Sequence, residues 1–187
     1  MIQTVVIIPT RLKAKRLPDK PLKLINQKEM ILHVYDLAVK SGVGDVLVTT
    51  PDKSISELIK NHGGKSFISK HSHETGTDRV FEAFNQFYLS KPQIIINLQG
   101  DMPNLNSNDI INLNNYIKSS NCDVATLASD FATAEEISDK NVVKVETKQS
   151  INVTRFSEAF DFKREVKDTQ DKNIYHHIGI YGFTNKA

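Results

Sequence analysis

The sequence predicts an α/β protein in which helices cover both faces of a mainly parallel sheet. Short apolar runs alternate with amphipathic segments along residues 5–128, which is the pattern of buried parallel strands joined by helices. Polar segments rich in basic, hydroxyl and acidic side chains follow three of these runs. In an open parallel sheet such segments meet at one edge, where ligands bind.

The expected strands and helices alternate regularly in this part of the chain. The strands are expected at residues 5–8, 45–50, 66–69, 93–98 and 123–128, and the helices at 29–41, 53–62, 78–89 and 107–119. Gly42 stands where a C-terminal cap of the first helix belongs. Asp52 is the expected N-cap of the second helix, and Ser107 or Asn108 opens the fourth.

Beyond residue 128 the alternation gives way to a strand-rich pattern. A short helix at 134–138 precedes three stretches that resemble strands, NVVKVET, SINVTRF and HHIGIYGF. We therefore expect a single domain over residues 1–187. Within it, an α/β part at 1–128 is followed by a smaller strand-rich part at 129–187.

The composition is that of an ordinary globular protein. Of the 187 residues 39% are hydrophobic and 25% charged, and the net charge of +2 argues against a general nucleic-acid binder. No apolar run approaches the roughly 20 residues of a membrane span, and no signal-peptide pattern opens the chain. Cys122 is the only cysteine, which fits a reducing compartment. We expect a cytoplasmic protein that binds neither nucleic acid nor membrane.

The segment after the first expected strand concentrates positive charge. Seven Lys or Arg residues and one acid, Asp19, lie between positions 11 and 28. Arginine makes bidentate phosphate contacts and lysine supplies a compact charge, so Arg11, Arg16 and Lys20 are candidates to bind a phosphate-bearing ligand. The glycines of a Walker A motif are absent from the segment. A solvated basic loop is the alternative interpretation.

Two further motifs belong to the same expected edge. In TGTDR, residues 75–79, Gly76 would let the backbone approach a planar base, while Thr77 has an alternative role as a helix cap. In QGDMP, residues 99–103, Asp101 directly follows a buried strand. It is a candidate Mg²⁺ ligand, because Mg²⁺ is held by few carboxylates together with substrate phosphates. The alternative for Asp101 is an ordinary turn residue beside glycine.

Four motifs together resemble the 3-deoxy-manno-octulosonate (KDO) cytidylyltransferase family. They are VVIIPTR with KRLPDKPL, HETGTDR, NLQGDMP and HIGIYGF, and they span essentially the whole chain in the family's order. The first and third are shared with sugar nucleotidyltransferases more broadly. The resemblance implies a Rossmann-like nucleotidyltransferase fold and Mg²⁺-dependent transfer of CMP from CTP to KDO, with release of pyrophosphate. It also implies a homodimer that activates KDO for lipopolysaccharide biosynthesis.

The resemblance further implies roles for individual residues. Arg11 and Lys20, with Arg16 nearby, would neutralise the CTP phosphates, and Asp101 would hold the metal. The cytosine would be read by Thr75, Gly76, Thr77, Asp78 and Arg79, with Gln99 beside them. Arg155, His177 and Tyr181 would line the sugar-acid pocket, whereas a half-buried strand is the alternative for the last two. The part at 1–128 would then bind the nucleotide, and the part at 129–187 the sugar and the second subunit.

Three features depart from the family pattern. Asp19 stands where the family has glycine, and Ala14 where it has serine. The chain ends at Ala187, where the family continues with a segment that carries a second metal-binding aspartate. We therefore expect this chain alone to be nearly inactive and prone to associate. A synthetase for a related acidic sugar and an inactive truncated remnant are alternative hypotheses, and a nucleic-acid binder is the most distant one.

Overall fold

The computed structural model of the protein describes residues 3–13, 17–166 and 173–187. The chain divides into two compact units. One consists of Met1–Ala125 and Ile180–Ala187, and the other of Thr126–Gly179. These bounds differ from the expected parts 1–128 and 129–187, because the end of the chain returns to the first unit. In the described ranges no helix combines the length and the apolar character that crossing a membrane requires.

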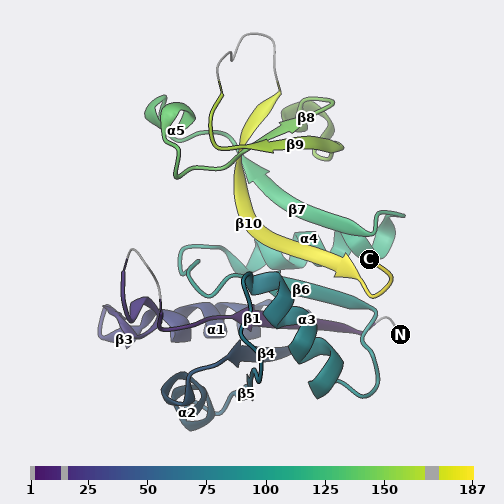
Figure 1. The fold of residues 1–187 in the computed structure, drawn as a ribbon. Helices are drawn as coiled ribbons and strands as arrows, with labels where there is room; N and C mark the ends of the chain where they lie inside the picture. Colours follow the sequence, from purple (N-terminus) through teal and green to yellow (C-terminus); the bar gives the residue numbers. More distant parts are fainter. Residues whose placement is uncertain (1–2, 14–16, 167–172) are drawn as a thin grey trace. The chain divides into compact units, whose positions relative to one another are not determined.

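The first unit is built on a mainly parallel sheet (Figure 1). Its strands are β1 (Thr4–Pro9), β4 (Asp45–Thr50), β5 (Lys65–Ile68), β6 (Ile94–Leu98) and the C-terminal part of β10 (Ile174–Thr184). The hydrogen-bonded order is β5-β4-β1-β6-β10, and β10 alone of these runs antiparallel to its neighbour. The predicted positions of the four parallel strands are confirmed to within one residue.

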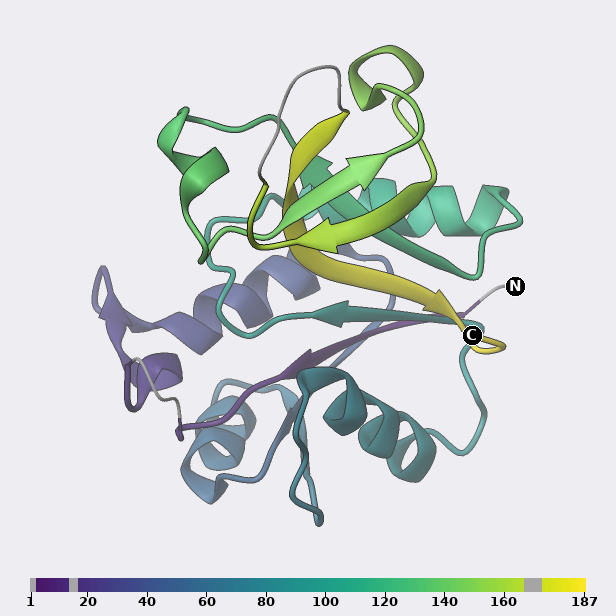
Figure 2. The same cartoon turned by 45° about the horizontal axis from the view of Figure 1, so that its top comes forward.

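Helices cover both faces of this sheet, as the sequence predicts. They are α1 (Met30–Ser41), α2 (Lys53–Asn61), α3 (Gly76–Phe87) and α4 (Ser107–Ser119). Val5 of β1 packs with Val80 of α3, whereas Thr4, on the opposite face, donates a 2.8 Å hydrogen bond to Asn114 Oδ1 of α4. Figure 2 shows α1 beside α4 on that opposite face. The predicted end of α1 is confirmed, since Gly42 closes it with φ 62°.

The strand next to β6 comes from the far end of the chain. β7 (Val124–Ser129), which the sequence predicts at 123–128, pairs with β10. β10 in turn pairs with β6, in a register that places Tyr181 opposite Asn97. Gly182 lets α4 pack closely on β10, because a Cβ there would lie 2.1 Å from Ile117 Cδ1 and the isoleucine side chain would have to shift.

The second unit is built on antiparallel strands. β8 (Lys144–Thr147) pairs with β9 (Ala159–Lys163) and with the N-terminal part of β10. Two short helices, α5 (Glu135–Ser138) and α6 (Ile151–Thr154), accompany them. Lys144 is fully buried, and its ammonium donates to the backbone carbonyls of Asp139, Val142 and Arg164 at 2.5, 2.9 and 3.1 Å. The remaining regular elements among the described residues are a 3-10 turn, η1 (Lys20–Leu22), and a small hairpin of β2 (Leu24–Ile25) and β3 (Lys28–Glu29).

One prediction for the second unit is wrong. SINVTRF forms not a strand but the single helical turn α6, in which the amides of Val153 and Thr154 donate to the Ser150 carbonyl. The turn ends at Arg155, which has φ 62°. Alternating apolar residues mislead here because four residues are too few to show a helical period. β9 follows in the segment AFDFK, which the sequence analysis does not identify as a strand.

Candidate active site

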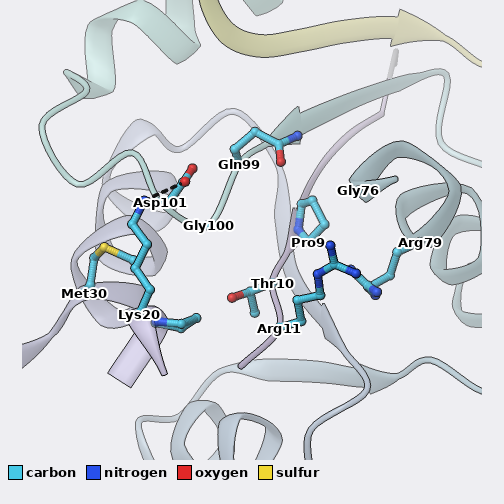
Figure 3. A pocket seen from close by; sticks show the side chains of 11 residues that line it. Pro9, Thr10, Arg11, Lys20, Met30, Gly76, Arg79, Gln99, Gly100 and Asp101 are labelled. Atoms are coloured by element: carbon cyan, nitrogen blue, oxygen red, sulfur yellow. Dashed lines mark hydrogen bonds and ion pairs between the residues drawn. The ribbon is translucent and has the colours of Figure 1, made fainter. Parts of the chain in front are cut away.

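A cavity of about 260 Å³ lies at the carboxyl ends of β1 and β6 (Figure 3). It is lined by Pro9, Thr10, Arg11, Lys20, Pro21, Met30, Gly76, Arg79, Gln99, Gly100 and Asp101. Six of these are residues for which the sequence predicts contacts with CTP or metal: Arg11, Lys20, Gly76, Arg79, Gln99 and Asp101. The structure therefore brings all three polar segments together at one edge of the sheet, as expected for a ligand site.

Three hydrogen bonds from backbone amides anchor the basic segment beside this cavity. The amide of Thr10 donates to the carbonyl of Thr49 (3.0 Å), and the amide of Leu12 donates to Asp52 Oδ2 (2.8 Å). The amide of Asp19 closes the segment on the Leu12 carbonyl (3.2 Å). Asp52 stands at the N-cap of α2, but its carboxylate makes no capping hydrogen bond. The predicted capping role of Asp52 is thus replaced by an anchoring role, which a local pattern does not reveal.

Asp19 occupies a left-handed backbone conformation at the turn that presents Lys20. Its φ and ψ are 56° and 22°, and its carbonyl accepts from the amide of Leu22 (2.9 Å) to start η1. A position with positive φ favours glycine, which is the residue that the family pattern has here. Ala14, the second departure from that pattern, and Arg16, a predicted phosphate ligand, lie outside the described residues.

The cavity contains an ion pair between the basic segment and the loop after β6. Lys20 Nζ donates to Asp101 Oδ2 at 2.8 Å (Figure 3). The two side chains are 36% and 52% exposed, so the pair adds little to stability. The ion pair places the ammonium group of Lys20 beside Asp101, the one carboxylate that is predicted to bind metal.

Asp101 is the one carboxylate of the cavity lining that could hold a magnesium ion. Among the described residues no group of three or more His, Cys, Asp or Glu side chains could hold a metal ion. Mg²⁺ is commonly bound by one or two carboxylates, with substrate phosphates and water completing its coordination. The cations that line the same cavity suit those phosphates, so the donor set fits a metal that arrives with a nucleotide.

Arg79 is a buried cation next to a second cation. It is 5% exposed, and its Nε has no hydrogen-bond partner among the described residues. Burial lowers the pKa of its guanidinium, and the neighbouring charge of Arg11 lowers it further. The two side chains extend toward one another in Figure 3. Two close guanidinium groups, one of them incompletely paired, favour the binding of an anion between them.

The backbone of Gly76 approaches the side chains of Pro9 and Gln99 on the other side of the cavity. A Cβ on Gly76 would lie 3.1 Å from Gln99 Oε1 and 3.3 Å from Pro9 Cγ, so glycine keeps this surface open. Asn97, which is fully buried in β6, donates to Thr77 Oγ1 (3.2 Å) and accepts from Gln99 Nε2 (3.0 Å). Asn97 is not among the predicted site residues, although a polar residue inside the apolar run QIIINL is a usable signal.

Thr75 and Asp78 form the N-terminal cap of α3. Thr75 Oγ1 accepts from the amide of Asp78 (3.2 Å), and the Asp78 carboxylate accepts from the amide of Thr75 (3.2 Å). The Thr75 hydroxyl also donates to Asp78 Oδ2 (2.7 Å), and this hydrogen bond, together with that from the Thr75 amide, lowers the pKa of Asp78. The cap is therefore Thr75, whereas Thr77, the alternative from the sequence, lies inside the helix. Thr75, Thr77 and Asp78 do not line the cavity and would act on a base through the placement of Gly76 and Arg79.

The three predicted sugar-binding residues belong to different units. Arg155 and His177 lie in the second unit, and Tyr181 lies in the first. His177 Nε2 is 2.9 Å from Thr126 Oγ1, and burial, aided by the charge of His176, lowers its pKa to about 4. Burial also raises the pKa of Tyr181. The half-buried strand that the sequence offers as an alternative is present at both positions, while their contact with a sugar stays a prediction.

The fold and the site together define a nucleotide-binding α/β protein of the nucleotidyltransferase type, with its cations and one acidic residue at the carboxyl edge of the sheet. The chain belongs to the cytidylyltransferase family, whose model matches residues 5–187.

Individual relatives resemble the chain over nearly its whole length. The 3-deoxy-manno-octulosonate cytidylyltransferase of Wigglesworthia glossinidia brevipalpis is 38% identical, over 99% of this chain and 77% of the relative. That of Bartonella quintana is 35% identical, over 100% and 76%. A solved structure of CMP:2-keto-3-deoxy-manno-octonic acid synthetase complexed with CTP is 32% identical, with a TM-score of 0.83 over 97% of this chain and 74% of that chain.

Proposed function

We propose that the protein transfers CMP from CTP to KDO and releases pyrophosphate. The observation that carries this proposal is the cavity in which Arg11, Lys20 and Asp101 meet the Gly76–Gln99 surface. Members of the same family that are named for this reaction, and a similar structure complexed with CTP, support it. In this reaction the anomeric hydroxyl of KDO attacks the α-phosphorus of CTP. The protein need not supply a nucleophile.

The residues of the cavity would act by positioning and by charge. Arg11 and Lys20 neutralise the triphosphate, and they stabilise the negative charge that develops on the departing pyrophosphate. Arg79, buried beside Arg11, adds to the positive potential in the same cavity. Gly76 and Gln99 lie on the side of the cavity where a planar base would rest, with the Gln99 amide oriented by Asn97. Arg16 is proposed to assist with the phosphates.

Asp101 would hold Mg²⁺ together with the phosphate oxygens. When bound, this ion offsets phosphate charge and favours the geometry of in-line displacement. Lys20 already places a positive charge on Asp101 Oδ2, so the carboxylate is oriented toward the cations of the cavity. We further propose that Arg155, His177 and Tyr181 contact the sugar acid, whose carboxylate and hydroxyls need cationic and hydrogen-bonding partners.

The proposal also covers the pathway, the cellular compartment and the oligomeric state. The product would serve lipopolysaccharide biosynthesis in the cytoplasm, and the protein would act as a homodimer. These assignments follow from the resemblance of the motifs to the KDO enzymes. An enzyme for a related acidic sugar and a remnant that no longer turns over are the alternatives.

Pyrophosphate release tests the reaction directly. With Mg²⁺, CTP and KDO the protein should release pyrophosphate, while ATP, GTP and UTP should be poor substrates. Equal rates with N-acetylneuraminate would favour the related sugar, and CTP binding without turnover would favour the remnant. An absence of both CTP binding and turnover would contradict the proposal.

Asp101→Asn tests the metal site. The variant should fold normally, require more Mg²⁺ and turn over much more slowly, because a carboxylate ligand is lost. Asp45→Asn is the matched control, since Asp45 also accepts from a lysine (Lys65, 2.7 Å) but lies at the start of β4, at the opposite edge of the sheet. An unchanged rate and Mg²⁺ requirement for Asp101→Asn would mean that Asp101 is only a turn residue.

A further inference from the structure

A second carboxylate near the cavity, Glu82, has no place in the reaction as described above. It lies on α3, one turn beyond Arg79, and is 7% exposed. The cavity lining does not include it. A buried carboxylate is costly unless hydrogen bonds satisfy its oxygens, so its partners indicate what it does.

The donors to Glu82 come mainly from the segment that leads into the TGTDR motif. Oε1 accepts from the amide of Lys70 (3.0 Å) and faces His71 Nδ1 at 3.0 Å. Oε2 is 2.5 Å from Nε2 of His73, whose side chain is 12% exposed. Gln86 on the same helix adds a weaker contact to Oε1 (3.3 Å). One side chain therefore ties residues 70–73 to α3.

The charge state of Glu82 agrees with these contacts. Burial alone would raise the pKa of Glu82, but the hydrogen bonds from His73, Lys70 and His71 outweigh burial and lower it to about 2. The carboxylate is thus ionised across the physiological pH range. Its negative charge also favours the charged form of Arg79, the buried cation of the cavity.

The tied segment precedes the residues that form the base side of the cavity. Residues 70–73 are followed by Thr75, which caps α3, and by Gly76, whose Cα surface faces Gln99. A shift of the 70–73 segment would be transmitted to the cap and to Gly76. A misplacement of about 1 Å in such a site can cost a hundredfold in rate.

We propose that Glu82 is a positioning residue for nucleotide recognition, which holds the segment at residues 70–73, and through it Thr75 and Gly76, in the geometry that accepts cytosine. The inference rests on the proposed function. It predicts that loss of the Glu82 carboxylate weakens recognition of the base and spares recognition of the phosphates, because Arg11 and Lys20 belong to a different segment.

Binding measurements on Glu82→Gln test this split. The dissociation constants of CTP, UTP and inorganic tripolyphosphate are measured by calorimetry, without KDO. Glu82→Gln should weaken CTP binding at least about tenfold and reduce the preference for CTP over UTP. Tripolyphosphate binding should be unchanged or tighter, since a negative charge near Arg79 is removed. Lys20→Ala should instead weaken the binding of CTP, UTP and tripolyphosphate alike and keep the preference for CTP over UTP, because the three ligands share the phosphates.

Two further variants keep the test decisive. Asp36→Asn is the matched control, because Asp36 also accepts from a histidine (His62 Nε2, 2.8 Å) and from Lys28, but lies on α1 outside the cavity lining. It should leave all three constants unchanged. His73→Leu removes one donor and keeps the carboxylate, so it should reproduce the CTP defect even if Glu82→Gln folds poorly.

The outcomes separate the two proposals. Wild-type protein that shows no preference for CTP over UTP overturns the proposed function. Wild-type preference for CTP that persists in folded Glu82→Gln or His73→Leu overturns the positioning role. Equal weakening of CTP and tripolyphosphate would also overturn it, since that result would indicate a general loss of structure.

Discussion

At the scale of single residues, Asp19 shows how a substitution acts on both backbone and charge. Its φ of 56° places a side chain where glycine has no steric penalty, and its carboxylate adds negative charge to the segment that carries Lys20. A left-handed conformation costs a residue with Cβ roughly 1 kcal/mol, and less for Asp than for most residues. The two effects can be separated by mutation.

Asp19→Gly should be neutral or beneficial. Relief of the left-handed strain is partly offset by the greater entropy of glycine in the unfolded chain, so the free energy of unfolding should change by less than about 1 kcal/mol. The Michaelis constant for CTP should fall, and this gain should shrink as salt rises. Asp19→Asn removes only the charge and should give the same CTP effect. A loss of CTP binding in either variant would show that Asp19 contributes to CTP binding.

Lys20→Ala should weaken the use of CTP more than the use of KDO. One lost charge-assisted contact with a phosphate is worth about 1.5–3 kcal/mol, or roughly a tenfold to hundredfold rise in the CTP Michaelis constant. The thermal midpoint should barely change, because the Lys20–Asp101 pair is exposed.

Lys65→Ala is the control for Lys20→Ala. Lys65 forms an equally short, exposed pair with Asp45 at the other edge of the sheet. Its removal should change neither Michaelis constant. Both constants are measured by steady-state kinetics. If Lys20→Ala changed only the Michaelis constant for KDO, the basic segment would not bind the triphosphate.

At the scale of elements, the start of α3 combines a stability device with a binding surface. Thr75 and Asp78 form a capping box, in which the side chain of each accepts a hydrogen bond from the backbone amide of the other. Gly76 and Arg79 of the same turn line the cavity. α4 begins with the same device, in which Asn106 and Asp109 are the partners. Of these two described helices, which share the same kind of cap, only α3 belongs to the candidate site.

Thr75→Ala and Asn106→Ala should differ in function and agree in stability. Each loses a capping hydrogen bond and should lower the free energy of unfolding by about 1 kcal/mol, measured by urea denaturation. Only Thr75→Ala should also raise the dissociation constant of CTP, because its cap fixes Gly76. Equal CTP affinity in the two variants would show that the cap is purely structural.

At the scale of the whole molecule, the two units contain separate sets of buried groups, and β10 contributes residues to both. In the second unit, His177 is a buried histidine whose pKa is lowered to about 4. An unfolded chain restores the ordinary value of about 6.5. Between these values the unfolded state binds more protons than the folded state, so stability increases with pH.

His177 should therefore make the protein less stable in acid. Its contribution is complete above about pH 6.5 and is lost as the pH falls toward 4, with a slope of up to about 1.4 kcal/mol per pH unit. His177→Gln should flatten the dependence of the unfolding free energy on pH between 4.5 and 6.5. His33→Gln, a change in the first unit, should leave it intact. A slope that survives in His177→Gln would assign it to other groups.

The local patterns of the sequence determined the elements of the first unit. Apolar runs placed β1, β4 and β6, because strands buried on both faces have few polar positions. Gly42 marked the end of α1, because only glycine adopts φ 62° without penalty. The edge of the sheet where Arg11 and Asp101 meet followed from chain direction alone, since parallel strands end on the same side.

The tertiary structure decided everything that depends on a partner distant in the sequence. It paired β10 with β6, gave the Asp52 carboxylate to the amide of Leu12, and buried Glu82 beneath the histidines of the 70–73 segment. It also turned SINVTRF into α6, where a short pattern fits a strand and a helical turn equally well. Sequence spacing records which residues share a face of one element. The pairing of faces between elements depends on the tertiary structure, because there buried polar groups form hydrogen bonds and apolar faces pack together.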